Sequence, residues 1–310
     1  MMKRLWGEKP YHSLDYEMKQ RYGEKIYKVS LESGLTCPNR DGTLGQGGCI
    51  FCSGNGSGDF ASPQTSSIRT QIDNGIRGLS KRKQVGNRFI AYFQSFTNTY
   101  APTEILRPMY MEALEHPDVV MLSIATRPDC LPTKVMKLLE ECRRIKPIIV
   151  ELGLQTIHES TANLIHRGYP LDVYNTAVES LKSIGIEVVT HVIAGLPQET
   201  ETDFLETVSH VGSRSDGIKI QLLHILKDTV LADMYLNQEF RALSQEEYIQ
   251  IVLRSLSILP EHIIIHRLTG DGPGHLLIAP EWSRRKRQVL NEIHRQLKIR
   301  NIWQGKEYNA

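Results

Sequence analysis

The sequence has little that would mark a membrane or a secreted protein. No apolar run approaches the roughly 20 residues that a membrane-spanning helix needs. The first segment, MMKRLWGEKPYHSLDYEMKQ, is polar after Trp6 and contains no apolar stretch typical of a signal peptide. We therefore expect a cytoplasmic protein with no membrane partner. Thiols stay reduced in that compartment, so clustered cysteines there indicate metal binding or catalysis rather than disulfides.

Strong charge, internal repeats and low-complexity linkers are also missing. The formal net charge is only +2 over 310 residues, which neither requires nor excludes a nucleic-acid partner. Hydrophobic residues make up 40% of the chain and charged residues 23%, a composition typical of globular proteins. The sequence therefore predicts one principal domain.

Short apolar, β-branched segments alternate with amphipathic segments along the chain. Strands are predicted at residues 25–31, 88–93, 119–126, 148–155, 187–196, 217–226 and 262–268. Each is followed by a helical pattern, which is typical of a parallel sheet covered by helices. We expect an α/β fold, a complete or partial (β/α) TIM-type barrel formed by residues 25–270. Residues 1–24 and a basic helical segment, 271–310, are predicted to be terminal extensions.

Cysteine is scarce, but three of the five cysteines lie in one glycine-rich loop, residues 35–60. They are Cys37, Cys49 and Cys52, and the loop follows the first predicted strand, where barrel enzymes carry their chemistry. A structural zinc site usually needs four ligands in two close pairs, and no fourth cysteine or histidine is nearby. Three thiolates on a four-iron cluster would leave one iron open for chemistry. We favour the cluster; a zinc-stabilised, non-catalytic nucleic-acid-binding module is the alternative.

The motif CIFC with a third cysteine upstream resembles the radical S-adenosylmethionine (SAM) superfamily. Eleven residues separate the upstream cysteine from this motif, rather than the usual three. The segments TCPNRDGTLGQGGCIFC and YFQSFTNTYAP are similar to the YhcC/YtqA-type subfamily, which is related to the Elongator catalytic subunit. The resemblance implies one [4Fe-4S] cluster on the three loop cysteines, SAM, and a reductant such as flavodoxin or ferredoxin. Cys130 and Cys142 are too few for a second cluster, and we expect buried apolar side chains there.

The same resemblance implies where SAM binds. Gln155 would hydrogen-bond the ribose, and Arg167 would pair with the SAM carboxylate; a surface arginine is the alternative at position 167. His191 would contact the ribose, although a buried, satisfied histidine fits that position as well. Val192 and Ile193 would flank the adenine, and ordinary strand core is compatible with both.

Three further segments are assigned by resemblance or by position. Gln94 and Ser95 would present backbone groups to the SAM amino group. The motif ATRPD resembles the TRPD of the Elongator catalytic subunit, which implies that Arg127 and Asp129 face the mouth of the site; a helix entry capped by Asp129 is the alternative. The loop 266–275 would line the substrate side or serve as a structural loop.

Two basic runs bear on the substrate. RRKR at 284–287 continues into a helix with Arg295, Lys298 and Arg300, and RGLSKRK lies at 77–83. Basic stripes suit a phosphate backbone, whereas a solvated helix face is the plainer interpretation. The subfamily resemblance implies a tRNA substrate, with carboxymethylaminomethyl converted to aminomethyl at carbon 5 of the wobble uridine. A radical SAM enzyme for a small metabolite or a protein is the alternative.

Overall fold

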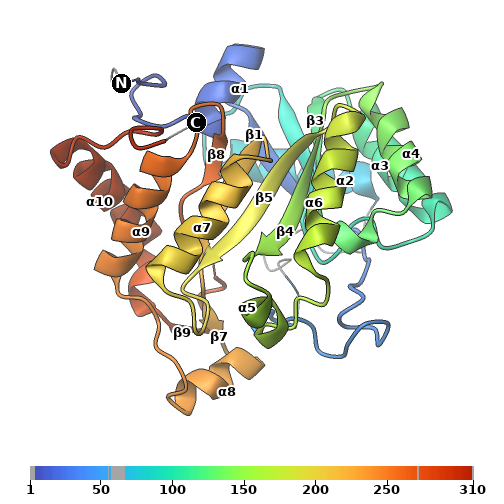
Figure 1. Ribbon diagram of the computed structural model, residues 1–310. Coiled ribbons are helices and arrows are strands. Elements are labelled where there is room, and N and C mark those ends of the chain that lie inside the picture. The colour runs from blue at the N-terminus through green and yellow to red at the C-terminus, as the bar shows by residue number, and fades with distance from the viewer. Residues whose placement is uncertain (1–3, 55, 57–66, 271, 309–310) are drawn as a thin grey trace.

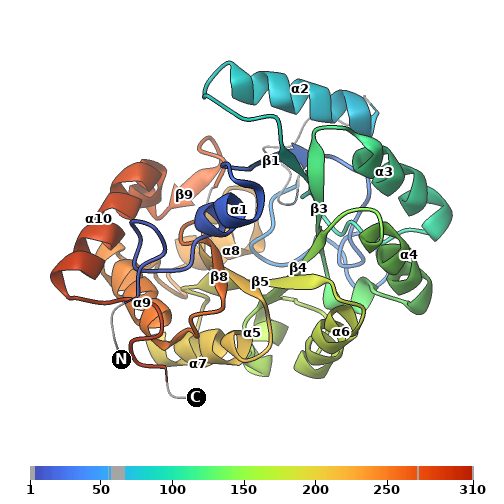
Figure 2. The same ribbon diagram turned by 90° about the horizontal axis from the view of Figure 1, so that it is seen from above.

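The computed structural model describes residues 4–54, 56, 67–270 and 272–308. Its main sheet has seven strands, all parallel to their neighbours, in the order β1-β2-β3-β4-β5-β6-β8. Their bounds are β1 Tyr27–Leu31, β2 Phe89–Phe93, β3 Val119–Thr126, β4 Ile148–Gln155, β5 Glu187–Ala194, β6 Gly217–Leu222 and β8 Ile264–Arg267. The sheet curls into an open half-barrel with β1 and β8 at its edges (Figure 2). The predicted α/β fold is confirmed in its partial-barrel form.

Helices cover the outer face of the sheet (Figure 2). They are α2 Ile68–Ser80, α3 Thr103–Glu115, α4 Thr133–Arg143, α6 Leu171–Ser183, α7 Glu201–Gly212 and α9 Gln245–Ile258. Their apolar stripes bury residues such as Tyr110, whose ring packs edge-on against Phe93 of β2 at 5.5 Å. Capping boxes at Thr200 and Ser244 fix where α7 and α9 begin.

The two ends of the half-barrel are built differently (Figure 1). Helix α1, Leu14–Tyr22, lies across the end where the strands begin, and the backbone N–H of Ile265 donates to the carbonyl of His12 at 2.7 Å. The strands run toward the other end, where the short helices α5, Glu159–Leu164, and α8, Val230–Leu236, lie. The loop that follows β1 reaches this end as well, beside α5.

One predicted strand is wrong in extent. Residues 217–226 do not form one strand, because β6 ends at Leu222 and a separate strand, β7 Ile225–Leu226, pairs antiparallel with β9 Leu277–Ala279. An apolar run alone does not say which neighbour a strand pairs with, so the sequence pattern missed the break. Strand β7 leads to α8, and strand β9, which follows β8, leads to the C-terminal helix.

The C-terminal segment begins with a 3-10 turn, η2 Glu281–Arg285, and continues as a helix. An earlier 3-10 turn, η1 Pro128–Cys130, follows β3. Helix α10, Lys286–Ile299, packs on α9 and buries Val289, Ile293 and Leu297. No helix in the described part of the chain is both long and apolar enough to cross a bilayer. The division at residues 24 and 270 stays a prediction.

Candidate active site

The loop after β1 is anchored at the strand ends by residues beside its cysteines. The amide Nδ2 of Asn39 donates to the carbonyl of His166 at 2.6 Å and approaches Cys49 Sγ at 3.5 Å. The guanidinium of Arg40 donates to the carbonyl of Cys52 at 3.1 Å. The sequence patterns did not single out Asn39 and Arg40, although both lie within the TCPNRDG segment. The Asn39 contact holds the loop against the turn after α5, and the Arg40 contact joins two parts of the loop.

Cys37, Cys49 and Cys52 line one cavity of about 150 Å³, and all three are half-buried free thiols. Burial, with a smaller contribution from the neighbouring Cys52, raises the pKa of Cys49 to about 12. Such a thiol stays protonated near pH 7 unless a positive centre such as a metal ion displaces its proton. Cys130 and Cys142 are buried and do not line this cavity, as predicted. Among the described lining residues there is no fourth cysteine. The loop positions 55 and 57–60 lie outside the described residues.

Gln155 ends β4 with a left-handed backbone, φ 69°, and lines the same cavity. Its Oε1 is buried and accepts no hydrogen bond, so a ligand donor such as a hydroxyl would satisfy it. A Cβ at position 153 would lie 2.8 Å from Gln155 Nε2, so Gly153 leaves the amide its room. Gln94 also lines the cavity, and Ser30 Oγ donates to its Oε1 at 2.9 Å. Ser95 is fully buried with an unpaired Oγ, and it is not brought to the cavity.

Arg167 is buried, with 2% of its side chain exposed, so the surface alternative is wrong. Its guanidinium donates to the carbonyls of Thr156 at 2.6 Å and Tyr169 at 2.9 Å, and to Glu159 Oε1 at 3.1 Å. It also stacks on the ring of Tyr169, with 4.8 Å from Cζ to the ring centroid. Arg167 lines the cysteine cavity. The Arg167 side chain therefore holds the turn after β4 through these hydrogen bonds, and it also lines the cavity in which a ligand would bind.

The three predicted SAM residues on β5, which are His191, Val192 and Ile193, lie on two different faces of the sheet. Successive side chains point to opposite faces of a strand. His191 and Ile193 line cavities inside the half-barrel, whereas Val192 is fully buried in the core on the helix side. The structure therefore does not bring the Val192 side chain together with the other predicted SAM residues.

The ATRPD motif forms an ion pair at the rim. The Arg127 guanidinium donates to both carboxylate oxygens of Asp129, at 2.9 and 2.7 Å, and lines the cysteine cavity. The Arg127 guanidinium also lies over the ring of Tyr169, with its Cζ 5.0 Å from the ring centroid, and Arg167 contacts the same ring. The alternative, in which Asp129 caps the following helix, is wrong, because the N-cap residue of α4 is Pro132 and no side chain caps that helix.

A buried cluster of charged residues forms the floor of the half-barrel. Glu151 of β4 is fully buried, and its carboxylate accepts from the ammonium groups of Lys28 on β1 and Lys219 on β6. Ser123 Oγ donates to it at 2.7 Å, and His191 Nε2 lies 2.8 Å from it. Burial alone would raise the pKa of Glu151, but Lys219 and Lys28 hold it well below its usual range. We call these five residues the Glu151 cluster.

The Glu151 cluster was not predicted, although the sequence carries a signal for it. The motifs IYKVSL, IVELGLQ and GIKIQL each carry one charged residue inside an apolar strand. Such residues are rarely buried without a partner. Since all three strands belong to one sheet, the isolated charges indicate mutual pairing inside the barrel.

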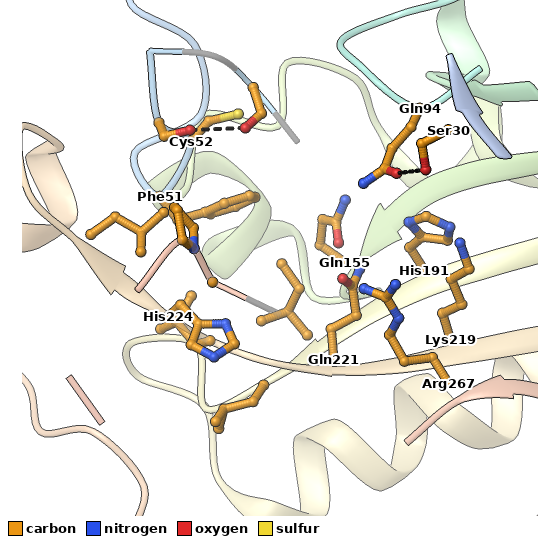
Figure 3. A pocket seen from close by; sticks show the side chains of 18 of the residues that line it. Ser30, Phe51, Cys52, Gln94, Gln155, His191, Lys219, Gln221, His224 and Arg267 are labelled. Carbon is orange, nitrogen blue, oxygen red and sulfur yellow. Dashed lines mark hydrogen bonds between the residues drawn. The ribbon is translucent and has the colours of Figure 1, made fainter. Parts of the chain in front are cut away.

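A second cavity, of about 300 Å³, adjoins the first one and shares lining residues with it; Figure 3 shows its lining. Both cavities are lined by Cys52, Gln94, Gln155 and His191. The second alone is lined by Lys219, Gln221, His224 and Arg267, and by Gly272 and Pro273 of the loop predicted at 266–275. Figure 3 shows Cys52 on one side of the space and Lys219 with Arg267 on the other. The candidate site is thus a two-lobed space: a cysteine lobe and a cationic lobe.

Comparison with protein families identifies this arrangement. Residues 36–211 match the family model described as the radical SAM superfamily, and residues 215–299 match the radical SAM C-terminal domain. The chain belongs to the radical SAM superfamily. Enzymes of this family use a [4Fe-4S] cluster and SAM, and three thiols and an orphaned acceptor in one cavity fit both groups. The alternative of a non-catalytic zinc module is therefore wrong.

Similar proteins include members of the subfamily expected from the motifs. The chain is 46% identical to YtqA of Bacillus subtilis (strain 168) over 96% of its own length and 93% of that protein. It is 34% identical to YhcC of Escherichia coli (strain K12) over 91% of this chain and 90% of that one. A more distant relative is the tRNA uridine(34) acetyltransferase of Methanocaldococcus jannaschii, 29% identical over 54% of this radical SAM chain and 31% of that enzyme.

A solved structure supports the fold. The Elp3 of Methanocaldococcus infernus with an N-terminal deletion superposes with a TM-score of 0.69 at 17% identity, covering 90% of this chain and 64% of that one. At that identity the match bears on the fold alone. It agrees with the half-barrel of parallel strands described above.

Proposed function

We propose that Cys37, Cys49 and Cys52 bind the [4Fe-4S] cluster, and that SAM occupies the adjoining space beside Gln155 and Arg167. The observation that carries this proposal is the convergence of three thiols and an unpaired Gln155 acceptor on one cavity. Bound there, the cluster and SAM would supply a 5′-deoxyadenosyl radical that takes a hydrogen atom from the substrate. The role of the protein's own residues is to hold SAM in one pose and to exclude water.

We propose further that the substrate is the wobble uridine of tRNA, with the C5 carboxymethylaminomethyl group converted to aminomethyl. In a balanced reaction the two carboxymethyl carbons would leave as glyoxylate, with SAM as the two-electron oxidant and water as the source of the new carbonyl oxygen. The similarity to a tRNA uridine(34) acetyltransferase supports this class of substrate. So does the position of the basic segment: Arg284 donates to the carbonyls of Gly274 and Leu277, next to the lining residues Gly272 and Pro273. Arg285 and the residues after it therefore begin at the rim of the cationic lobe.

The test is mass spectrometry of nucleosides from tRNA of cells with and without this protein. We expect carboxymethylaminomethyluridine to accumulate in its absence. Wild-type protein should restore the normal nucleoside profile, whereas the matched Cys49→Ala variant should not. An unchanged profile in the deletion strain would contradict the tRNA proposal and leave the radical SAM assignment intact.

A small metabolite or a protein is the second candidate for the substrate. It is favoured by the basic helix itself, where Arg295 pairs with Glu292 at 2.7 Å and Arg300 donates to Gln296 at 2.9 Å. Arginines engaged in this way are typical of a solvated helix face. Binding of the cluster-loaded protein to bulk tRNA across a salt series separates the two candidates, because phosphate contacts give a steep salt dependence. A cytoplasmic location and a reductant such as flavodoxin or ferredoxin belong to the proposal in either case.

A further inference from the structure

The Glu151 cluster contains more positive than negative charge when Lys219 is protonated, and because burial lowers the pKa of Lys219 to about 7, Lys219 holds that proton without a bound anion only near or below pH 7. Its single carboxylate is shared by two ammonium groups, with Lys28 on Oε1 and Lys219 on Oε2. Lys219 is nearly enclosed, with 6% of its side chain exposed, and Tyr92 Oη lies 3.1 Å from its Nζ. Burying two cations that share one counter-ion costs free energy, because the second positive charge is not fully compensated. Binding of another anion beside them would reduce this cost.

The histidines in the same region do not change the net charge around the two lysines. Burial, with a smaller contribution from Lys219, lowers the pKa of His191 to about 4. Burial also lowers the pKa of His266 well below its usual value. Both rings are therefore neutral near pH 7, and neither one changes the charge balance around the lysines.

A further cation lines the same lobe. Arg267 of β8 is the register partner of Lys219 on β6, so the two residues extend from adjacent positions on paired strands. Gln221 lies two residues beyond Lys219 and points into the same lobe (Figure 3). An ammonium, a guanidinium and an amide within one lobe form a set of donors suited to an oxyanion.

The SAM carboxylate is assigned to the opposite lobe. Arg167, Cys37 and Cys49 line the cysteine lobe and do not line the cationic one. Lys219 and Arg267 line the cationic lobe and do not line the cysteine one. A substrate anion beside Lys219 would therefore not compete with the SAM carboxylate for the same residues.

We propose that the cationic lobe binds a carboxylate of the substrate, with Lys219 and Arg267 as its principal partners and Gln221 as a neutral donor. The inference rests on the proposed function in one respect: the carboxymethylaminomethyl group ends in a carboxylate. Binding this group against the floor of the half-barrel holds the neighbouring carbon atoms between Cys52 and Lys219, in the space that both lobes share. The amine product has no carboxylate and cannot make this interaction.

The test compares three RNA hairpins whose wobble uridine carries carboxymethylaminomethyl, its neutral carbamoyl analogue, or aminomethyl. Affinity is measured anaerobically with the cluster-loaded, SAM-bound protein. The wild type should bind the carboxylate hairpin about 10- to 100-fold more tightly than the carbamoyl hairpin. Lys219→Met and Arg267→Gln should each abolish most of that preference while keeping iron content and SAM affinity. Arg241→Gln, at an exposed ion pair with Glu247, is the matched control and should keep the preference.

A second arm without RNA separates this inference from the proposed function. N-benzylglycine, N-benzylglycinamide and benzyl phosphate are titrated against the same proteins by ligand-observed NMR. Binding of N-benzylglycine that disappears in Arg267→Gln supports the carboxylate site even if no hairpin binds, and in that case the tRNA proposal fails alone. Equal binding of the glycine and the amide, or preference for the phosphate, overturns the carboxylate site. Arg267→Gln keeps Lys28, Ser123, His191 and Lys219 around Glu151, so it remains informative if Lys219→Met does not fold.

Discussion

Arg167→Ala tests the view that this arginine is both a structural clamp and a wall of the SAM site. The substitution removes the donors to two buried carbonyls, those of Thr156 and Tyr169, and the ion pair to Glu159. Each carbonyl left unpaired costs about 1–3 kcal/mol, so together they cost about 2–6 kcal/mol. Glu159 is 48% exposed, and the ion pair adds little because solvent screens it. The expected loss is a large share of a typical unfolding free energy of about 5–15 kcal/mol.

The assay is urea unfolding of cluster-loaded protein followed by circular dichroism under anaerobic conditions. Glu159→Gln is the matched control, since it keeps both carbonyl bonds and should retain most of the stability. SAM affinity is then measured on folded Arg167→Ala at low temperature, where we expect it to weaken by about one to three orders of magnitude. A loss of stability below about 1 kcal/mol would refute the clamp. Unchanged SAM affinity would remove Arg167 from the binding site.

The remaining predictions concern the cluster, the basic segment and the floor. Replacing any one of the three loop cysteines, for example Cys49→Ala, should abolish iron binding and SAM cleavage, whereas Cys142→Ala should leave iron content normal; equal loss in both would contradict the ligand set. Changing Arg285 and Arg287 together to Gln should lower the log–log salt slope of tRNA binding by about 0.7–0.9 for each phosphate interaction removed, with SAM cleavage unchanged. Burial lowers the pKa of Lys219 from 10.5 to about 7. Between pH 7 and 10.5, Lys219 is therefore mostly protonated in the unfolded chain and mostly deprotonated in the folded protein. Because the unfolded state binds more protons in this range, the contribution of Lys219 to stability falls as pH drops from 10.5 to 7. Urea titrations across that range should show a slope of at most about 1.4 kcal/mol per pH unit that is missing in Lys219→Met.

The strands could be predicted closely because both faces of the sheet are buried. Strands β3 and β4 occupy residues 119–126 and 148–155, as their apolar runs indicated. These apolar runs are continuous because helices cover one face of the sheet and the other face is turned into the half-barrel, so residues on both faces are mostly buried. The break after Leu222 was not visible, since the residues before and after it are equally apolar and differ only in the strand they pair with.

The floor of the site could not be predicted in the same way, because its contacts are distant in sequence. Lys28 and Glu151 are 123 positions apart, and Glu151 and Lys219 are 68 apart. A single charge in an apolar strand indicates that a partner exists, but the partner's identity depends on strand order and register. The family resemblance added little here, since it concerns groups that hold the cluster and SAM.

The long interval between Cys37 and Cys49 shows how local folding accommodates an unusual spacing. The intervening segment turns back on itself: the N–H of Gly42 donates to the carbonyl of Gly45 at 3.2 Å, and the N–H of Gly48 to the carbonyl of Asn39 at 2.9 Å. Gly48 has φ 91°, and a Cβ there would lie 2.9 Å from Arg40 Nε, so only glycine fits without displacing that side chain. The closed turn returns the chain to the cavity that Cys37 also lines. Sequence spacing is therefore a weak criterion for the proposed ligand set, and what matters is whether the loop between the proposed ligands can close on itself.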